Sequence, residues 1–327
     1  MILIFYFDCW NLLKLTQKVN ILKFLWRDVV VTMGDLMRSI STFTCYLCGN
    51  SKCSLIHDNI RYNLSPRPFR CDNCGFVFLY PRMTPEMEKE FYEKTYRYNY
   101  DIQTAEDLWQ ASLPEAKKRV LRFNELYGKD SRLLEIGCAS GYFLFEVKDY
   151  VKSVTGIELT KEYVKYAKSK GLNVKDSLNE VPDNSCDLIF MFHVLEHIDD
   201  PINFLKEVKK KLSQNGKLII EVPNVDDVLV SVYKIKNHLD FYWEIAHNYY
   251  FSKMSLGKVL ESSGYRYEIF PLQRYDLSNH MRWMLTGKPG GQGYFKSIYS
   301  QSLLDEYEKC LKEKFLCDTI YAIAEKN

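Results

Sequence analysis

The chain has 327 residues, 46% of them hydrophobic and 26% charged, and its net charge is +2. These proportions exclude a disordered, collagen-like or coiled-coil chain, and the length suggests about two globular domains. Because the charge is nearly balanced, it gives no strong electrostatic attraction to nucleic acid or to a membrane surface.

The first 32 residues admit two interpretations. The apolar run from Met1 to Phe7 ends at Asp8, lacks a preceding positive charge and is far shorter than the roughly 20 residues that span a bilayer. The stretch up to Val31 mixes lysines with large apolar residues, which is compatible with an amphipathic helix on a membrane or a partner. Alternatively, translation starts at Met33 and the segment is an extension outside the fold. Either way, we expect a cytoplasmic protein with no transmembrane segment.

Residues 33–82 are expected to form a small module that contains two CxxC pairs. The four cysteines are Cys45, Cys48, Cys71 and Cys74. A glycine follows each pair and allows the tight turn that points backbone amides at the sulfurs. This spacing predicts a structural zinc site with four thiolate ligands rather than a disulfide framework or two redox motifs. The same ligand set also suits iron.

Residues 83–130 are expected to form a helical linker that carries a tyrosine cluster and then a helix over residues 114–127. The clustered tyrosines are Tyr92, Tyr96, Tyr98 and Tyr100.

Strand and helix patterns alternate through the rest of the chain. Strands are expected at 133–136, 154–158, 172–175, 187–192, 217–222, 265–270 and 319–324. Helices are expected at 142–150, 161–170, 201–212, 252–263 and 303–314. This alternation predicts an α/β fold with a doubly wound, mostly parallel, seven-stranded sheet. The long segment 272–317 is expected to be a lid-like insertion, with Arg274, Asn279 and His280 near its start.

The first strand of this sheet leads into a loop with Gly137 and Gly141, and a helix follows. The glycines let the chain turn tightly and approach a ligand, and the start of the helix presents free backbone amides. Glu158 ends the second strand, where a carboxylate can take both hydroxyls of a ribose. The loop and the glutamate together predict a nucleotide-binding site.

These features resemble the class I S-adenosylmethionine-dependent methyltransferases, over about residues 133–324. The segments that carry the resemblance are 134–141, 156–158, 187–190, 193–198 and 217–224. The sequence departs from the family's first motif at Ala139, where the family has a glycine. The resemblance implies an enzyme that uses S-adenosylmethionine in a Rossmann-like domain over residues 131–327.

The resemblance also implies roles for residues at the strand ends. The residues implied in cofactor binding are Glu135, Gly137, Cys138, Ala139, Gly141, Glu158, Asp176 and His193. Glu135 would lie near the methionine amino group, Glu158 would bind the ribose, and Asp176 would sit by the adenine. His193 would line the methyl-transfer cleft, and the loop from Gly137 would pass under the cofactor.

The acceptor site is expected in residues 242–252, an aromatic-rich segment between the fifth strand and the next helix. Tyr242, Glu244 and His247 are the candidate catalytic residues. The segment resembles the one that closes the site in zinc-containing sugar C-methyltransferases, although the spacing of its tyrosine, glutamate and histidine differs. The resemblance implies a small polar acceptor, such as a nucleotide sugar or a glycan-linked sugar. His247 is either a catalytic base or a histidine that positions the substrate.

Two other functions stay open. Some RNA base methyltransferases place a zinc module before this fold, and the module here would then hold RNA. The balanced charge argues against a nucleic-acid partner, since phosphate contacts need clustered lysine and arginine. The segment after the fourth strand, His193-Val194-Leu195, also lacks an Asn-Pro-Pro type of catalytic motif. The third hypothesis is a non-catalytic scaffold that binds the cofactor or a partner.

Overall fold

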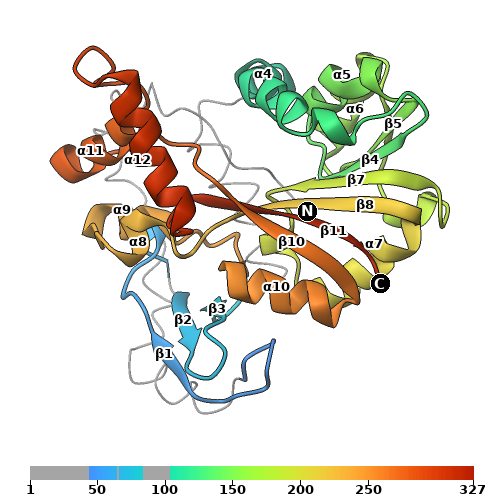
Figure 1. Ribbon diagram of the computed structural model, residues 1–327. Coiled ribbons are helices and arrows are strands. Elements are labelled where there is room, and N and C mark those ends of the chain that lie inside the picture. The colour runs from blue at the N-terminus through green and yellow to red at the C-terminus, as the bar shows by residue number, and fades with distance from the viewer. Residues whose placement is uncertain (1–43, 65, 84–103) are drawn as a thin grey trace, which may run out of the picture.

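The computed structural model describes residues 44–64, 66–83 and 104–327 (Figure 1). The N-terminal extension before Met33 and the tyrosine cluster at residues 92–100 lie outside the described residues. None of the helices in the described part of the chain is both long enough and apolar enough to cross a membrane.

The larger of two sheets has seven strands in the order β10-β11-β8-β7-β4-β5-β6. These strands are β4 (Arg132–Ile136), β5 (Ser153–Ile157), β6 (Asn173–Lys175), β7 (Cys186–Phe192), β8 (Leu212–Pro223), β10 (Tyr265–Leu272) and β11 (Thr319–Lys326). The strands β6, β5, β4, β7 and β8 run parallel, and β11 runs antiparallel to both β8 and β10. The predicted α/β fold with a seven-stranded, mostly parallel sheet is therefore confirmed.

Helices cover both faces of this sheet (Figure 1). The helices α4 (Ala105–Arg122), α5 (Tyr142–Val147) and α6 (Lys161–Ser169) pack on one face, and α7 (Pro201–Lys211) and α10 (Lys253–Ser262) pack on the other. The remaining helices of the described residues, α8 (Val228–Ser231), α9 (Lys236–Tyr242), α11 (Leu277–Thr286) and α12 (Gln301–Glu313), lie beyond one end of the sheet (Figure 1). Single 3-10 turns occur at Arg61–Asn63, Asn124–Leu126, Lys148–Tyr150, Leu178–Glu180 and Leu195–His197. Within β7, Leu188, Phe190 and Phe192 pack on the side of α4, α5 and α6, whereas Ile189 and Met191 pack on the side of α7 and α10. Both faces of this strand are thus buried, which explains its continuous run of apolar residues.

Helix α4 begins well before the predicted start at residue 114, so that prediction was wrong. The side chain of Thr104 accepts a hydrogen bond from the amide of Asp107 (3.1 Å), and Asp107 accepts one from the amide of Thr104 (2.9 Å). This reciprocal pair is a capping box and sets the helix start. Pro114 suggested a first helical position but lies in the helix interior.

The smaller sheet joins the cysteine module to the larger domain. Its strands are β1 (Cys53–Leu55), β2 (Arg67–Cys71), β3 (Val77–Tyr80) and β9 (Tyr249–Tyr250), in that order. Strand β9 comes from the segment between β8 and α10 and pairs antiparallel with β3, Val77 opposite Tyr250. The ring of Phe76 stacks on Tyr249 at 5.0 Å between centroids. The module therefore shares both a sheet and a hydrophobic core with the domain that follows it.

Candidate active site

The loop after β4 turns sharply and packs against β5. The amides of Gly137 and Cys138 both donate to the carbonyl of Ile157, at 2.8 and 3.0 Å. A Cβ on Gly141 would lie 2.5 Å from a methyl carbon of Leu172, and one on Gly156 would lie 2.4 Å from the sulfur of Cys138. Side chains at these two positions would push the loop away from the sheet, so both glycines are needed for the close approach.

Ala139 occupies the loop position where the methyltransferase family has a glycine, and its backbone has a φ of +47°. An L-residue reaches this left-handed region at a cost of about 1–2 kcal/mol, which glycine avoids. Its amide donates to Oε2 of Glu158 at 3.0 Å. Ala139 therefore adopts the backbone conformation that a glycine would adopt there, and its hydrogen bond to Glu158 helps to hold the loop in that conformation.

Glu158 follows β5 and is 2% exposed. Its other oxygen, Oε1, accepts from the amides of Leu159 and Thr160, at 2.8 and 2.7 Å. Burial raises the pKa of Glu158, and the hydrogen bonds from Thr160 and Ala139 oppose this effect. The side chain thus fastens the glycine loop to the end of β5, a contact that sequence analysis did not predict.

Asp176 lies next to Glu158 at the carboxyl end of the sheet. The amide of Glu158 donates to the carbonyl of Lys175 at 3.0 Å, so the residues that follow β5 and β6 are neighbours. Asp176 is exposed, whereas Glu158 is buried. The structure therefore places the two residues expected at the ribose and the adenine at neighbouring strand ends, with Glu158 inside the protein and Asp176 at its surface.

Glu135 has no partner for its carboxyl group within the described residues. It lies in β4 between Gly156 and Phe190 of the neighbouring strands and is 1% exposed. Neither carboxylate oxygen has a hydrogen-bond partner there. Burial raises the pKa of Glu135 to about 8, although Arg119 opposes the shift. A buried carboxyl without a partner is costly, so this position fits a ligand that brings a positive amino group.

This pKa predicts how stability without ligand depends on pH. The carboxyl group of Glu135 stays protonated up to about pH 8 in the folded chain, but only up to about pH 4.5 in the unfolded chain, where it is exposed to water. The folded state therefore binds the extra proton between these values, and stability should fall as the pH rises through them. Glu135→Gln should flatten this dependence in thermal unfolding measured from about pH 5 to 8. Glu207→Gln, on the exposed side of α7, is the control; parallel curves for all three proteins would contradict the assignment.

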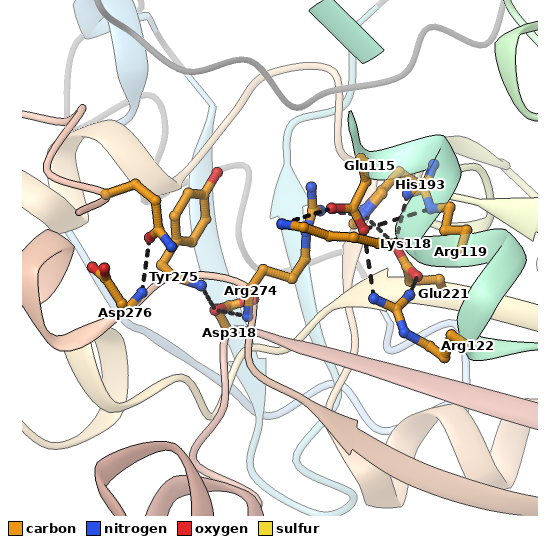
Figure 2. A network of polar contacts seen from close by, with 11 residues as sticks. Glu115, Lys118, Arg119, Arg122, His193, Glu221, Arg274, Tyr275, Asp276 and Asp318 are labelled. Carbon is orange, nitrogen blue, oxygen red and sulfur yellow. Dashed lines mark hydrogen bonds and ion pairs between the residues drawn. The ribbon is translucent and has the colours of Figure 1, made fainter. Parts of the chain in front are cut away.

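His193 follows β7 and joins a buried polar network (Figure 2). Its backbone φ is +56°, and its amide donates to the carbonyl of Glu221 at 2.8 Å. Its Nε2 lies 3.1 Å from Oε1 of Glu221 and 2.9 Å from Nη1 of Arg274. His193 is thus held by Glu221 of β8 and contacted by Arg274 at the start of the insertion.

Glu221 is the centre of this network and has no exposed surface. It accepts from Arg119 at 2.7 Å and from Arg122 at 3.0 Å, both on α4 (Figure 2). Burial alone raises its pKa, but the positive charge of Arg119, together with His193 and Arg274, outweighs this effect and lowers the pKa well below the ordinary value. Sequence analysis did not single out Glu221, Arg119 or Arg122.

The start of the insertion is fastened to the start of β11. Oδ2 of Asp318 accepts from the amides of Arg274 and Tyr275, at 2.8 and 3.0 Å (Figure 2). His280 is buried, and its Nδ1 lies 2.8 Å from the hydroxyl of Tyr307 on α12. Of the insertion residues expected over the substrate, Arg274 contacts the His193 network, whereas His280 packs inside the insertion.

The three candidate catalytic residues have different surroundings. The hydroxyl of Tyr242 donates to the carbonyl of Asn224 at 3.1 Å. Glu244 is 2% exposed and forms a 2.6 Å ion pair with Arg61 of the cysteine module. The ring of His247 meets that of His197 edge-on, at 4.8 Å between centroids. Burial lowers the pKa of His247 well below its ordinary value, and His197 and Arg61 add to the effect, so this imidazole is neutral at pH 7.

The sulfurs of the four module cysteines lie within 4.8 Å of one another. The distance is 3.5 Å both from Cys45 to Cys74 and from Cys48 to Cys71. These distances fit a tetrahedral site with bonds of about 2.3 Å from sulfur to metal. Burial raises the pKa of Cys71, but the amides of Cys74 and Asn73 outweigh it and lower the pKa to about 6, which favours the thiolate form.

Comparison with known proteins supports the expected activity class. A family model described as "Methyltransferase domain" matches residues 109–268. A tRNA U34 carboxymethyltransferase of Campylobacter concisus is 31% identical over 104 residues, 28% of this chain and 35% of that protein. The mitochondrial ubiquinone biosynthesis O-methyltransferase of Candida albicans is 31% identical over 122 residues, 33% of this chain and 37% of that protein. The chain thus spans little more than a third of either relative.

A solved structure of an S-adenosylmethionine-dependent methyltransferase from Archaeoglobus fulgidus covers 68% of this chain and 97% of its own, with 24% identity and a TM-score of 0.47. The family match begins after the cysteine module. Together with the order of the seven strands, it supports the Rossmann-like fold that was expected for a methyltransferase domain. None of these three proteins is named for a sugar acceptor.

Proposed function

We propose that this chain is a class I methyltransferase that transfers a methyl group from S-adenosylmethionine to a small polar acceptor. The observation that carries the proposal is the carboxyl group of Glu135 beside the glycine loop, which has no hydrogen-bond partner among the residues that the structure describes. In similar sheets, ligands bind at the carboxyl ends of the strands, which is where this loop and Glu158 lie. When bound, S-adenosylmethionine supplies a methyl group on a positively charged sulfur.

In this proposal each cofactor residue has a defined task. Glu135 binds the methionine amino group, Glu158 takes the ribose hydroxyls, and Asp176 faces the adenine. The backbone of residues 137–141 would pass under the cofactor, and its left-handed turns at Gly137, Ala139 and Gly141 give the loop the sharp bend that this needs. The network around Glu221 fixes the imidazole of His193 at the point where methyl transfer takes place.

Glu158→Ala should weaken the binding of S-adenosylmethionine without unfolding the protein. The substitution removes the proposed ribose contacts and frees the amide of Ala139. Hydrogen bonds to a charged group contribute about 1.5–3 kcal/mol, so the Kd should rise about 10- to 100-fold. Isothermal titration calorimetry measures this change. Glu207→Ala should leave the Kd unchanged, and an unchanged Kd in Glu158→Ala would sink the ribose assignment.

The acceptor side is proposed to be residues 242–252 together with the cysteine module that packs on them. The ion pair with Arg61 favours a positioning role for Glu244, and Tyr242 is held by Asn224. His247 is neutral and can bind an acceptor or a metal ion. Trp243, Tyr249, Tyr250 and Phe251 are buried in the core, whereas Tyr242 is only partly buried. The ring of Tyr242 suits the apolar face of a sugar, so a nucleotide sugar or glycan-linked sugar is the proposed substrate class.

RNA is the second candidate acceptor, because the relatives include proteins named as tRNA U34 carboxymethyltransferases. A transfer assay separates the two. Radiolabelled S-adenosylmethionine and purified protein are added to cell extract, which is then fractionated into RNA, lipid-linked glycan and small nucleotides. Label in the glycan or nucleotide fraction would support the proposal. Label in RNA would overturn it, and no label in any fraction would favour a non-catalytic scaffold.

A further inference from the structure

One carboxylate and two imidazoles meet beside the acceptor segment. Glu196 and His197 lie in the 3-10 turn that follows β7, and His247 lies just before β9. Their potential ligand atoms all lie within 4.8 Å of one another. Two histidine nitrogens and one carboxylate oxygen form a donor set that suits zinc and other first-row divalent metals.

Hydrogen bonds hold the segment that carries Glu196 and His197 against the segment that carries His247. The amide of Asn248 donates to the carbonyl of Glu196, and its side-chain amide donates to the carbonyl of His197, both at 2.9 Å. Nδ1 of His197 lies 2.8 Å from the carbonyl of Ala246. A carbonyl only accepts, so Nδ1 carries the hydrogen and Nε2 of the neutral ring presents its lone pair. Contacts of this kind fix the orientation of histidines that bind metals.

The charge of Glu196 also favours a bound cation. Its side chain is 1% exposed, and its ion-pair partner is Nδ1 of His193, at 3.3 Å. Across residues 44–64, 66–83 and 104–327, no lysine or arginine lies within ion-pairing distance of it, and its Oε2 has no hydrogen-bond partner. Buried carboxylates are normally paired with a positive charge or bound to a metal.

We propose that Glu196, His197 and His247 bind one divalent metal ion, with zinc as the ion that their donors suit best. Three protein ligands leave a coordination position for an oxygen of the acceptor. The substrate class then narrows to acceptors with a hydroxyl group, and the metal lowers the pKa of that hydroxyl so that its proton passes to water. This last step rests on the proposed function, whereas metal binding does not.

The metal content of the full-length protein tests the proposal. We expect about two equivalents of zinc per chain by mass spectrometry, one for the four cysteines and one for this site. Glu196→Gln and His247→Ala should each contain about one equivalent. The control His57→Ala, whose imidazole pairs with Asp240, should retain both. One equivalent in the wild-type protein, or two in both site variants, would overturn the proposal.

Cobalt substitution identifies which site is filled. Cobalt bound to four thiolates gives an intense sulfur-to-metal charge-transfer band, whereas a site with nitrogen and oxygen donors gives weak visible bands without it. The site variants should lose only the weak bands and should still bind S-adenosylmethionine, which shows that they are folded. Loss of the charge-transfer band instead would overturn the assignment. Intact metal binding without any methyl transfer would disprove the proposed function while leaving the metal site standing.

Discussion

Glu221→Ala should lower the free energy of unfolding by about 3–5 kcal/mol, the usual cost of removing one partner from a buried ion pair. Glu221 has no exposed surface, and its carboxylate accepts from Arg119 and Arg122 and contacts His193. Arg119 is 2% exposed, and its guanidinium lies 4.0 Å from the ring centre of Phe192. Without Glu221, the charge of Arg119 would stay buried, and the carboxylate of Glu115 would lie 4.0 Å away instead of 2.7 Å. Urea unfolding followed by circular dichroism measures the loss.

Two further variants separate the charge effect from the loss of packing. Glu221→Gln keeps the shape of the side chain and can still accept hydrogen bonds, so its cost should lie between those of the wild type and the alanine variant. Glu207→Ala removes an ion pair with Lys210 in which both side chains are more than half exposed. Exposed pairs contribute about 0–1 kcal/mol, so this change should be small. A loss of less than about 1 kcal/mol in Glu221→Ala would show that the network is not a main source of stability.

The parts of the site that could be predicted from the sequence are those whose geometry is local. The turn at Gly137 and Gly141 depends on residues that are adjacent in the chain. Glu158 is the first residue after a strand, so its position at the strand end could also be predicted. Strands such as Cys186–Phe192 contain an apolar run that can be recognised without knowledge of the neighbouring strands. The two CxxC pairs are likewise local features, because each pair forms a tight turn of its own. These features leave a signal within about ten residues.

The parts that could not be predicted depend on contacts between distant segments. Arg119 and Glu221 are 102 residues apart in the chain. Charged residues normally lie at the surface, so nothing in the sequence indicates that the fold buries these two. Strand β9 has only two residues, which is too short to show an alternating pattern. Its pairing with β3 was therefore not visible, although it is the contact that joins the two sheets.

Glu244 shows why a motif alone does not assign a role. Its place with His247 in an aromatic-rich segment suggested catalysis, and the structure places both residues in one buried segment. Its ion-pair partner, Arg61, belongs to the cysteine module, which a local motif search treats as a separate unit. Because that contact crosses between the two sheets, it could be found only after the module had been placed against the larger domain.

Through this connection the cysteine module holds the proposed acceptor segment in place. The amide of Arg61 donates to the carbonyl of Trp243, and its Nε donates to the carbonyl of Phe241, both at 2.8 Å. The amide of Leu79 donates to the carbonyl of Asn248 at 3.2 Å. Residues 241–250 are therefore held at several points by this small module, and modules of its size usually need a metal or disulfides to keep their shape.

Cys71→Ser combined with Cys74→Ser should release the metal and loosen residues 241–250 while leaving cofactor binding intact. Structural zinc contributes about 10–16 kcal/mol to the folding of small zinc peptides, so the module should lose its order. Amide hydrogen exchange in residues 241–250 should then accelerate, and methyl transfer should fall about 100-fold because the acceptor is misplaced. The free energy of S-adenosylmethionine binding should change by less than about 0.5 kcal/mol, since no module residue contributes to the proposed cofactor site.

Cys310→Ser is the matched control, because this cysteine is exposed on α12 and lies outside the four-cysteine cluster. It should leave exchange, transfer and cofactor affinity unchanged. Faster exchange throughout the seven-stranded sheet in the double variant would mean that the module supports the whole fold rather than the acceptor segment. Unchanged exchange in residues 241–250 after metal loss would show that β9 and Glu244 hold their positions without the module, and the proposed coupling would fail.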